Sequence, residues 1–201
     1  MYGTEAYYDK TAAQWAENGY QEDGELACLG EFLAMLPEGG RVLDLCCGAG
    51  YESGRVKQRG FGVVGIDFSG ESLRIARERN PQIPFYRENM LSSYAHIGQV
   101  DGILLIAGLV HIETRELPLA FRRMSEVLIP GGLALVSIRE GVGKLPEWSY
   151  LQVDGADYDR NFIAHTLEEL MAAAEGKFSY RRELTSDTPV WHYYVFQRNA
   201  G

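Results

Sequence analysis

The amino-acid sequence predicts an α/β fold with a doubly wound, mostly parallel sheet. Between residues 41 and 138, short apolar runs alternate with segments of helical spacing, the pattern of parallel strands joined by crossover helices. The first apolar run leads directly into the turn Gly48-Ala49-Gly50, which lets a helix begin close to a ligand. The C-terminal quarter instead has two strand-like runs around a polar turn, which predicts an antiparallel hairpin.

Two helices are expected before the alternation begins. Residues 7–18 mix Tyr, Ala and Trp and are expected to form a helix. Residues 24–36 place leucines on one helical face, and Pro37 with the pair Gly39-Gly40 ends this second helix. We therefore expect residues 1–36 to form an N-terminal helical arm or cap.

The alternating region is expected to supply five strands and three helices. Ser69 is the expected N-cap of the second of these helices, and Pro118 falls in the first turn of the third, where proline is tolerated. The run Pro130-Gly131-Gly132 is expected to separate this third helix from the fifth strand with a sharp stop. The strands are expected over residues 41–46, 62–67, 83–87, 102–107 and 133–138, and the helices over 51–59, 70–79 and 117–128.

The C-terminal quarter is expected to complete the sheet. Thr166 and Glu169 form a capping box that opens a helix through Ala174. Strands over residues 178–184 and 190–198 follow, with a short polar turn between them. The predicted sheet thus has seven strands and ends in an antiparallel edge.

Length and charge limit the function classes. At 201 residues the chain is expected to form a single domain, residues 1–201. Lys and Arg number 19 against 28 Asp and Glu, a formal net charge of −9. Proteins that bind the phosphate backbone of nucleic acids normally carry an excess of basic residues. We therefore expect neither nucleic acid nor a membrane surface as a partner, and no apolar run approaches a membrane span in length.

The cysteines indicate neither zinc binding nor a disulfide framework. Cys28, Cys46 and Cys47 show no C-x-x-C spacing, and no metal site is expected. The start of the chain is polar and aromatic and has no signal-peptide core. A reducing, cytoplasmic location is expected.

Polar residues recur at the ends of the expected strands. Asp44 lies inside the first apolar run, where an unpaired carboxylate is costly. Asp67 ends the second strand, Asn89 follows the third and Asp101 opens the fourth. Together with the glycine turn and the downstream run 128–132, this order and spacing resembles the class I S-adenosylmethionine-dependent methyltransferases, in particular their small-molecule enzymes.

The resemblance implies a Rossmann-like sheet of order 3-2-1-4-5-7-6 and S-adenosyl-L-methionine as the cofactor, with S-adenosyl-L-homocysteine as its product. The glycine turn would carry the methionine end, and Asp44 would stabilise the positive charge there. Asp67 would accept from both ribose hydroxyls, and Phe68 would pack on the adenine. The cofactor-binding residues that the resemblance implies are Tyr8, Asp44, Cys46, Gly48, Gly50, Asp67, Phe68, Asn89, Met90 and Ile106.

The implied cofactor-binding residues match the family pattern in different ways. Asn89 stands where the family usually has an Asp that accepts from the adenine amino group, and an amide carbonyl can also accept. Met90 would offer its backbone N–H to the ring, and Ile106 a backbone carbonyl to the cofactor's amino group. Cys46 replaces the usual first glycine of the family pattern. Tyr8 belongs to a stretch that resembles the arm closing over the cofactor.

Two features bear on the methyl acceptor. His111 follows the fourth strand and is the first candidate for a general base; the alternative is a hydrogen-bonded histidine packed under its loop. Residues 141–165 are rich in aromatic side chains. They would form either a lid over an apolar or aromatic acceptor, or a long loop packed on the core.

The predicted function is transfer of a methyl group to a small-molecule acceptor by in-line displacement, in a monomer or homodimer. One alternative is an NAD(P)-binding oxidoreductase, because its fingerprint also has an acid about 20 residues after the glycines. Ser53 stands where that fingerprint needs its third glycine. The other alternative is a non-catalytic cofactor-binding domain, since a fold does not fix a function. The sequence leaves the acceptor atom open among O, N, C and S.

Overall fold

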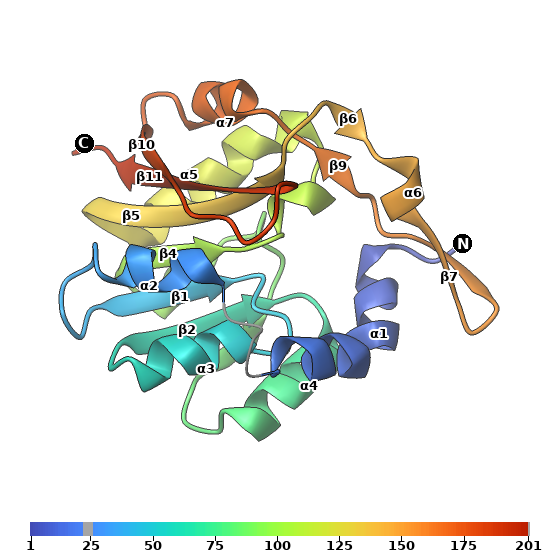
Figure 1. Cartoon of the computed structure of the whole chain (residues 1–201). Coiled ribbons are helices and arrows are strands. Elements are labelled where there is room, and N and C mark those ends of the chain that lie inside the picture. Colours follow the sequence, from blue (N-terminus) through green and yellow to red (C-terminus); the bar gives the residue numbers. More distant parts are fainter. Residues whose placement is uncertain (22–25, 201) are drawn as a thin grey trace.

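The computed structural model describes residues 1–21 and 26–200, and it is organised around one seven-stranded sheet (Figure 1). The strand order is β10-β11-β5-β4-β1-β2-β3. Strands β1 to β5 run parallel, while β11 pairs antiparallel with both β5 and β10. The predicted fold class, strand order and terminal hairpin are confirmed. The strands of this sheet are β1 (Arg41–Leu45), β2 (Gly62–Asp67), β3 (Phe85–Arg87), β4 (Val100–Leu105), β5 (Leu128–Arg139), β10 (Phe178–Leu184) and β11 (Trp191–Arg198).

Helices cover both faces of the sheet, because its strands send apolar side chains to both sides. Along β1, Leu43 and Leu45 pack in the cluster with α5 and α7, whereas Val42 packs in the cluster with α2, α3 and α4. Both clusters are almost completely buried. The helices are α2 (Ala27–Leu33), α3 (Tyr51–Gln58), α4 (Gly70–Arg79), α5 (Leu117–Val127) and α7 (Leu167–Ala174), with short 3₁₀ turns η1 (Ala95–Ile97), η2 (Leu109–His111) and η3 (Thr114–Glu116).

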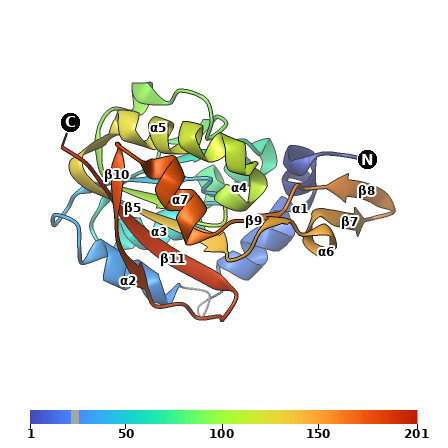
Figure 2. The same cartoon turned by 90° about the horizontal axis from the view of Figure 1, so that it is seen from above.

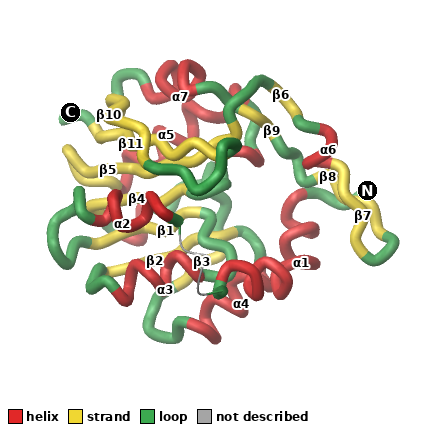
Figure 3. Tube along the Cα trace, viewed as in Figure 1, coloured by secondary structure: helices red, strands yellow, loops and turns green. Residues whose placement is uncertain are grey.

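The first helix of the predicted N-terminal arm is α1 (Thr4–Gly19), which lies beside α4 (Figure 3). The second predicted helix is confirmed from Ala27 to Leu33. Gly24 and Glu25, at the predicted start of that helix, lie outside the described residues. Across the described ranges, no helix combines the length and apolar character needed to cross a bilayer.

The predicted stop at Pro130-Gly131-Gly132 is wrong. Strand β5 begins at Leu128, directly after α5 ends at Val127. Leu128 already pairs with Val100, and the register shifts before Gly102 pairs with Leu133. Gly131 adopts a φ of +80°, so these residues form an irregular first part of the strand. Extending the strand lets the buried Leu128 join the core beside α5.

Residues 141–165, here called the cover segment, have their own secondary structure. Strands β6 (Gly143–Lys144) and β9 (Ile163–Ala164) pair at its base, and β7 (Tyr150–Val153) and β8 (Ala156–Asp159) form a hairpin at its tip. The short helix α6 (Pro146–Ser149) lies between them.

The N-terminus lies beside this hairpin, on the side of the molecule away from the C-terminus (Figures 1 and 2). The Tyr2 N–H donates to the Asp157 carbonyl at 2.8 Å, and the Asp159 N–H donates to the Tyr2 carbonyl at 2.8 Å. The arm and the cover segment are therefore joined by residues far apart in the chain, Tyr2 on one side and Asp157 and Asp159 on the other.

Candidate active site

A cavity of about 250 Å³ opens at the carboxyl ends of β1, β2 and β4, between α1 and the cover segment. This is the edge at which doubly wound sheets bind their ligands. Predicted site residues that line it are Tyr8, Cys46, Gly48, Asp67, Phe68, Met90, Ile106 and His111. Eight of the residues predicted from the sequence therefore line this cavity.

Asp67 is the acidic group of this cavity. Its Oδ2 accepts from the Gly48 N–H and its Oδ1 from the Ser69 N–H, both at 2.8 Å. Burial raises the pKa of Asp67, and these backbone donors oppose that rise. A carboxylate has about four lone-pair sites, so both oxygens can still accept hydrogen bonds from hydroxyl groups of a ligand.

The glycine turn is packed tightly behind the cavity. Gly50 caps α3 with a φ of +78°, and a Cβ there would lie 3.0 Å from both Ala76 and Phe85. The Tyr20 hydroxyl donates to the Ala49 carbonyl at 2.8 Å. Gly48 has open space where its Cβ would stand. Gly48 therefore faces the cavity, while Gly50 does not line it and shapes the turn.

Two non-glycine residues of the cavity wall adopt left-handed backbone conformations. Cys46 has a φ of +64° and Ala107 a φ of +54°. A glycine adopts this conformation without strain. The backbone conformation therefore explains why glycine is the expected residue at the position of Cys46. Strained backbone of this kind concentrates at functional sites.

Asp44 and Asn89 do not line the cavity. Asp44 is buried, and its Oδ2 accepts from the Ser53 hydroxyl at 2.5 Å. Desolvation raises the pKa of Asp44 to about 6. The Asn89 side-chain carbonyl accepts from the Leu91 N–H at 2.8 Å. The Ser53 hydroxyl therefore supplies the hydrogen bond that the buried Asp44 needs, and the Asn89 side chain stabilises the turn that contains it.

His111 lies in the wall and bonds to two different parts of the chain. Its Nδ1 is 3.0 Å from the Arg160 carbonyl, and its Nε2 is 2.8 Å from the Tyr8 hydroxyl. Because a carbonyl only accepts, Nδ1 carries the proton, and Nε2 accepts from the tyrosine O–H. Burial lowers the pKa of His111 to about 4, and burial raises that of Tyr8 well above its usual range. Both groups are therefore neutral at pH 7.

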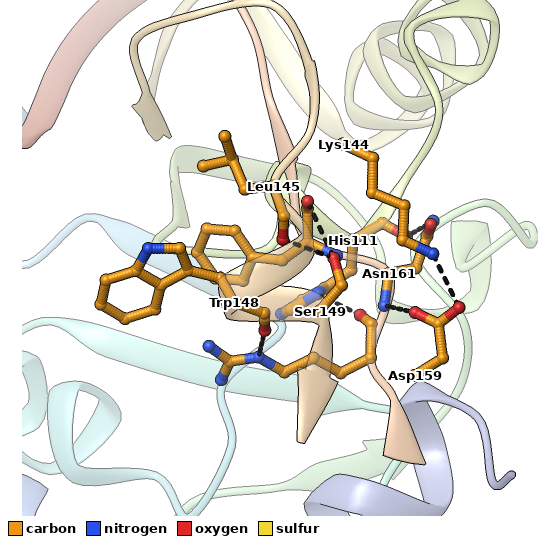
Figure 4. A network of polar contacts seen from close by, with 9 residues as sticks. His111, Lys144, Leu145, Trp148, Ser149, Asp159 and Asn161 are labelled. Carbon is orange, nitrogen blue, oxygen red and sulfur yellow. Dashed lines mark hydrogen bonds and ion pairs between the residues drawn. The ribbon is translucent and has the colours of Figure 1, made fainter. Parts of the chain in front are cut away.

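The cover segment holds this corner of the cavity in place (Figure 4). The Ser149 hydroxyl donates to the Leu145 carbonyl at 2.9 Å, and Lys144 pairs with Asp159 at 2.7 Å. The Asn161 amide donates to the His111 carbonyl at 3.3 Å. The histidine thus receives contacts from the segment through its ring and through its backbone.

Sequence reasoning missed some of the lining. In the cover segment, Trp148 and Phe162 belong to the aromatic run that was expected either as a lid or as a loop packed on the core, and Arg160 was not singled out. Trp191, at the start of β11, was also missed. An arginine in an irregular segment is normally exposed, so nothing in the sequence marked Arg160 as buried.

The described residues contain no group of three or more His, Cys, Asp or Glu side chains arranged to hold a metal ion. The polar chemistry of the cavity comes instead from one acid, one neutral histidine–tyrosine pair and one arginine, set among aromatic rings. This arrangement suits an organic ligand with hydroxyl groups and flat apolar parts.

The chain is similar in sequence to known methyltransferases. A family model described as a methyltransferase domain matches residues 42–132. Over 108 residues the chain is 37% identical to the 2-phytyl-1,4-naphtoquinone methyltransferase of Thermosynechococcus vestitus, covering 50% of this chain and 47% of that protein. It is 27% identical over 189 residues to the trans-aconitate 2-methyltransferase of Afipia carboxidovorans, covering 90% of this chain and 72% of that protein. The chain spans about half the length of several such curated relatives.

The fold is also that of solved methyltransferases. A TehB-like SAM-dependent methyltransferase from Corynebacterium glutamicum superposes with a TM-score of 0.74 at 15% identity, covering 96% of this chain and 100% of the other. The complex of DhpI with SAH gives a TM-score of 0.75 at 17% identity, covering 98% and 96% of the two chains. At these identities the likeness is one of fold.

Proposed function

We propose that the chain is a class I S-adenosylmethionine-dependent methyltransferase, and that it transfers a methyl group from S-adenosyl-L-methionine to a small-molecule acceptor; its similarity to a methyltransferase-domain model over residues 42–132 and to curated methyltransferases supports this. The observation that carries the proposal is the buried Asp67 carboxylate in the cavity, bonded to the backbone of the glycine turn. The cofactor, when bound, supplies an electrophilic methyl carbon, whose bond to sulfur breaks as the lone pair of the acceptor attacks in line.

The cavity residues fit this cofactor. The Asp67 oxygens retain lone pairs for two ribose hydroxyls. Phe68 and Met90 offer apolar surface for an adenine ring. The open space beside Gly48 leaves room for close approach to the backbone. We propose Tyr8, Cys46, Gly48, Asp67, Phe68, Met90 and Ile106 as direct contacts, and Asp44, Gly50 and Asn89 as residues that shape the turns behind them.

Positioning and exclusion of water account for most of the rate in this proposal, because methyl transfer needs no covalent enzyme intermediate. Helix α1 of the arm and the cover segment close the cavity from two sides and are proposed to do this work. Tyr8 contributes from the arm, and Trp148 and Phe162 from the cover segment.

His111 is proposed as the group that receives a proton when the acceptor carries one. Its Nε2 is the unprotonated nitrogen and lies on the cavity wall. The Tyr8 hydroxyl now occupies it, so the tyrosine must give way to an acceptor before this nitrogen can serve as a base. An acceptor that reacts as an anion needs no such step.

The names of the relatives do not identify the acceptor. A naphthoquinone, trans-aconitate and a malonyl-[acyl-carrier protein] appear among them, and these molecules do not belong to one chemical class. We propose a small molecule that fits among aromatic rings, and leave its reacting atom open.

The three free thiols of Cys28, Cys46 and Cys47 support a reducing, cytoplasmic location.

Calorimetric titration tests the function directly. We expect the protein to bind S-adenosyl-L-homocysteine with micromolar affinity, and NAD⁺ and NADH not at all, because Ser53 stands where a dinucleotide turn needs its third glycine. Binding of NADH without binding of S-adenosyl-L-homocysteine would establish the oxidoreductase instead. Binding of neither would favour a non-catalytic domain.

A further inference from the structure

We propose that Arg160 binds a carboxylate group of the methyl acceptor, so that the enzyme acts on a small aromatic or apolar carboxylic acid. This inference rests on the proposed function and goes beyond it by naming the chemical class of the acceptor. It comes from a buried cation that faces the cavity without an anionic partner.

Arg160 is 4% exposed and lines the cavity. Its Nε donates to the Trp148 carbonyl at 2.7 Å. Among residues 1–21 and 26–200, its Nη1 and Nη2 donate no hydrogen bond and its guanidinium forms no ion pair with a carboxylate. A buried charge without a counter-charge is costly, so an anionic ligand at this position would relieve that cost.

The surroundings hold the guanidinium with its outer edge available. Its central carbon lies 5.2 Å from the centroid of the Tyr7 ring and 4.8 Å from that of Phe162. Such ring contacts stabilise the charge of the guanidinium but supply no oxygen acceptor to it. The N–H groups of Nη1 and Nη2 form no hydrogen bond with the described residues. This fork matches the two oxygens of a carboxylate.

The position of Arg160 favours the acceptor over the cofactor as the source of that carboxylate. Its carbonyl accepts from His111, the residue proposed to meet the acceptor, and its side chain contacts α1 and α6. Asp67 and the glycine turn, which are proposed to hold the cofactor, bond instead to one another and to the start of α4. The rings of Trp148, Phe162 and Trp191 line the same cavity and suit an aromatic or apolar acid.

Matched ligand pairs test the proposal. The protein is saturated with S-adenosyl-L-homocysteine and titrated with benzoate, phenylacetate and trans-cinnamate, and with the neutral amide of each acid. We expect at least one acid to bind on the order of 10- to 100-fold more tightly than its own amide, the effect of charge-assisted bonds to a buried guanidinium. Equal binding of every acid and its amide would overturn the proposal.

Variants connect the preference to Arg160. Arg160→Gln should abolish the difference between acid and amide while leaving S-adenosyl-L-homocysteine affinity unchanged, and Arg160→Lys should retain part of it. The control is Arg139→Gln, because the Arg139 guanidinium also lies over Trp148, at 4.9 Å, without lining the cavity. This control should keep the full difference.

Two results would contradict the assignment in different ways. If Arg160→Gln lost affinity for S-adenosyl-L-homocysteine itself, the guanidinium would serve the carboxylate of the cofactor and the acceptor proposal would be wrong. If the wild-type protein did not bind S-adenosyl-L-homocysteine, the proposed function would fall, and this inference with it. Should Arg160→Gln not fold, the acid–amide comparison on the wild-type protein and on Arg160→Lys decides the question.

Discussion

Asp67 is the side chain on which the proposed cofactor site most depends, because its carboxylate joins the glycine turn to the start of α4 at the edge of the cavity. We expect Asp67→Ala to weaken S-adenosyl-L-homocysteine binding by about 1–3 kcal/mol, the loss associated with hydrogen bonds to a charged group. Titration calorimetry measures this loss.

Asp101→Ala is the matched control for that substitution. Asp101 also accepts from a backbone N–H, that of Arg41 at 2.7 Å, but it lies toward the other end of the sheet, away from the cavity. It should alter stability and leave affinity unchanged. Equal affinity in the Asp67→Ala and wild-type proteins would remove Asp67 from the site.

The burial of His111 predicts how the stability of the folded protein depends on pH. Burial lowers its pKa to about 4, below the ordinary value of 6.5. Between these values the unfolded chain binds a proton at this residue and the folded protein does not, so folding stability falls as the pH falls from about 6.5 toward 4. His111→Gln removes this contribution. We therefore expect the difference in urea midpoint between wild type and His111→Gln to shrink, or to change sign, from pH 7 to pH 4.5.

Asp44 acts in the opposite direction and is present in both proteins. Its pKa is raised to about 6, so the folded protein takes up this proton before the unfolded chain does and gains stability as the pH falls from about 6 to about 4. Comparing the wild-type protein with His111→Gln cancels this effect. A difference that stayed constant across the pH range would contradict a buried, neutral His111.

For individual residues, the positions of polar side chains at strand ends were predictable from the sequence. Their hydrogen-bond and packing partners were not. Asp67, Gly48 and His111 could be located because strand ends meet at one edge of a doubly wound sheet. That Ser53 satisfies Asp44, or that Arg160 is buried against Tyr7, depends on contacts between distant segments. Local sequence patterns carry no such information.

Among the elements, the turn between β1 and α3 gives the sharpest test of packing. Gly50 and Gly48 both have positive φ, but only Gly50 would place a Cβ 3.0 Å from the side chains of Ala76 and Phe85. Overpacking of this kind costs about 1–3 kcal/mol. We expect Gly50→Ala to lower the free energy of unfolding by that much more than Gly48→Ala does, as measured by urea denaturation. Equal losses would mean that backbone strain alone sets both values.

The regular elements were predictable because each is long enough to show a period. Helix α5 repeats apolar residues at helical spacing, and β2 and β4 are apolar except for one acid each. The cover segment could not be divided in this way, because strands of two residues and a helix of four have no detectable period. The early start of β5 was missed because Pro130 and Gly131 are usually a break.

For the molecule as a whole, the cavity exists because distant parts of the chain meet over the sheet edge. Tyr2 is held between Asp157 and Asp159, Lys10 pairs with Asp154 at 2.7 Å, and Tyr8 bonds to His111. Both the arm and the cover segment were expected from sequence, but their contact with each other was not. This contact encloses the site and makes exclusion of water possible.

We propose that the cavity between Asp67 and His111 holds the cofactor, and a crystal structure of the protein with S-adenosyl-L-homocysteine is the decisive measurement. We expect the ribose hydroxyls at the Asp67 carboxylate and the sulfur directed toward the space between His111 and Arg160. S-adenosyl-L-homocysteine bound outside this cavity, or with its ribose away from Asp67, would show that Asp67 does not hold the cofactor.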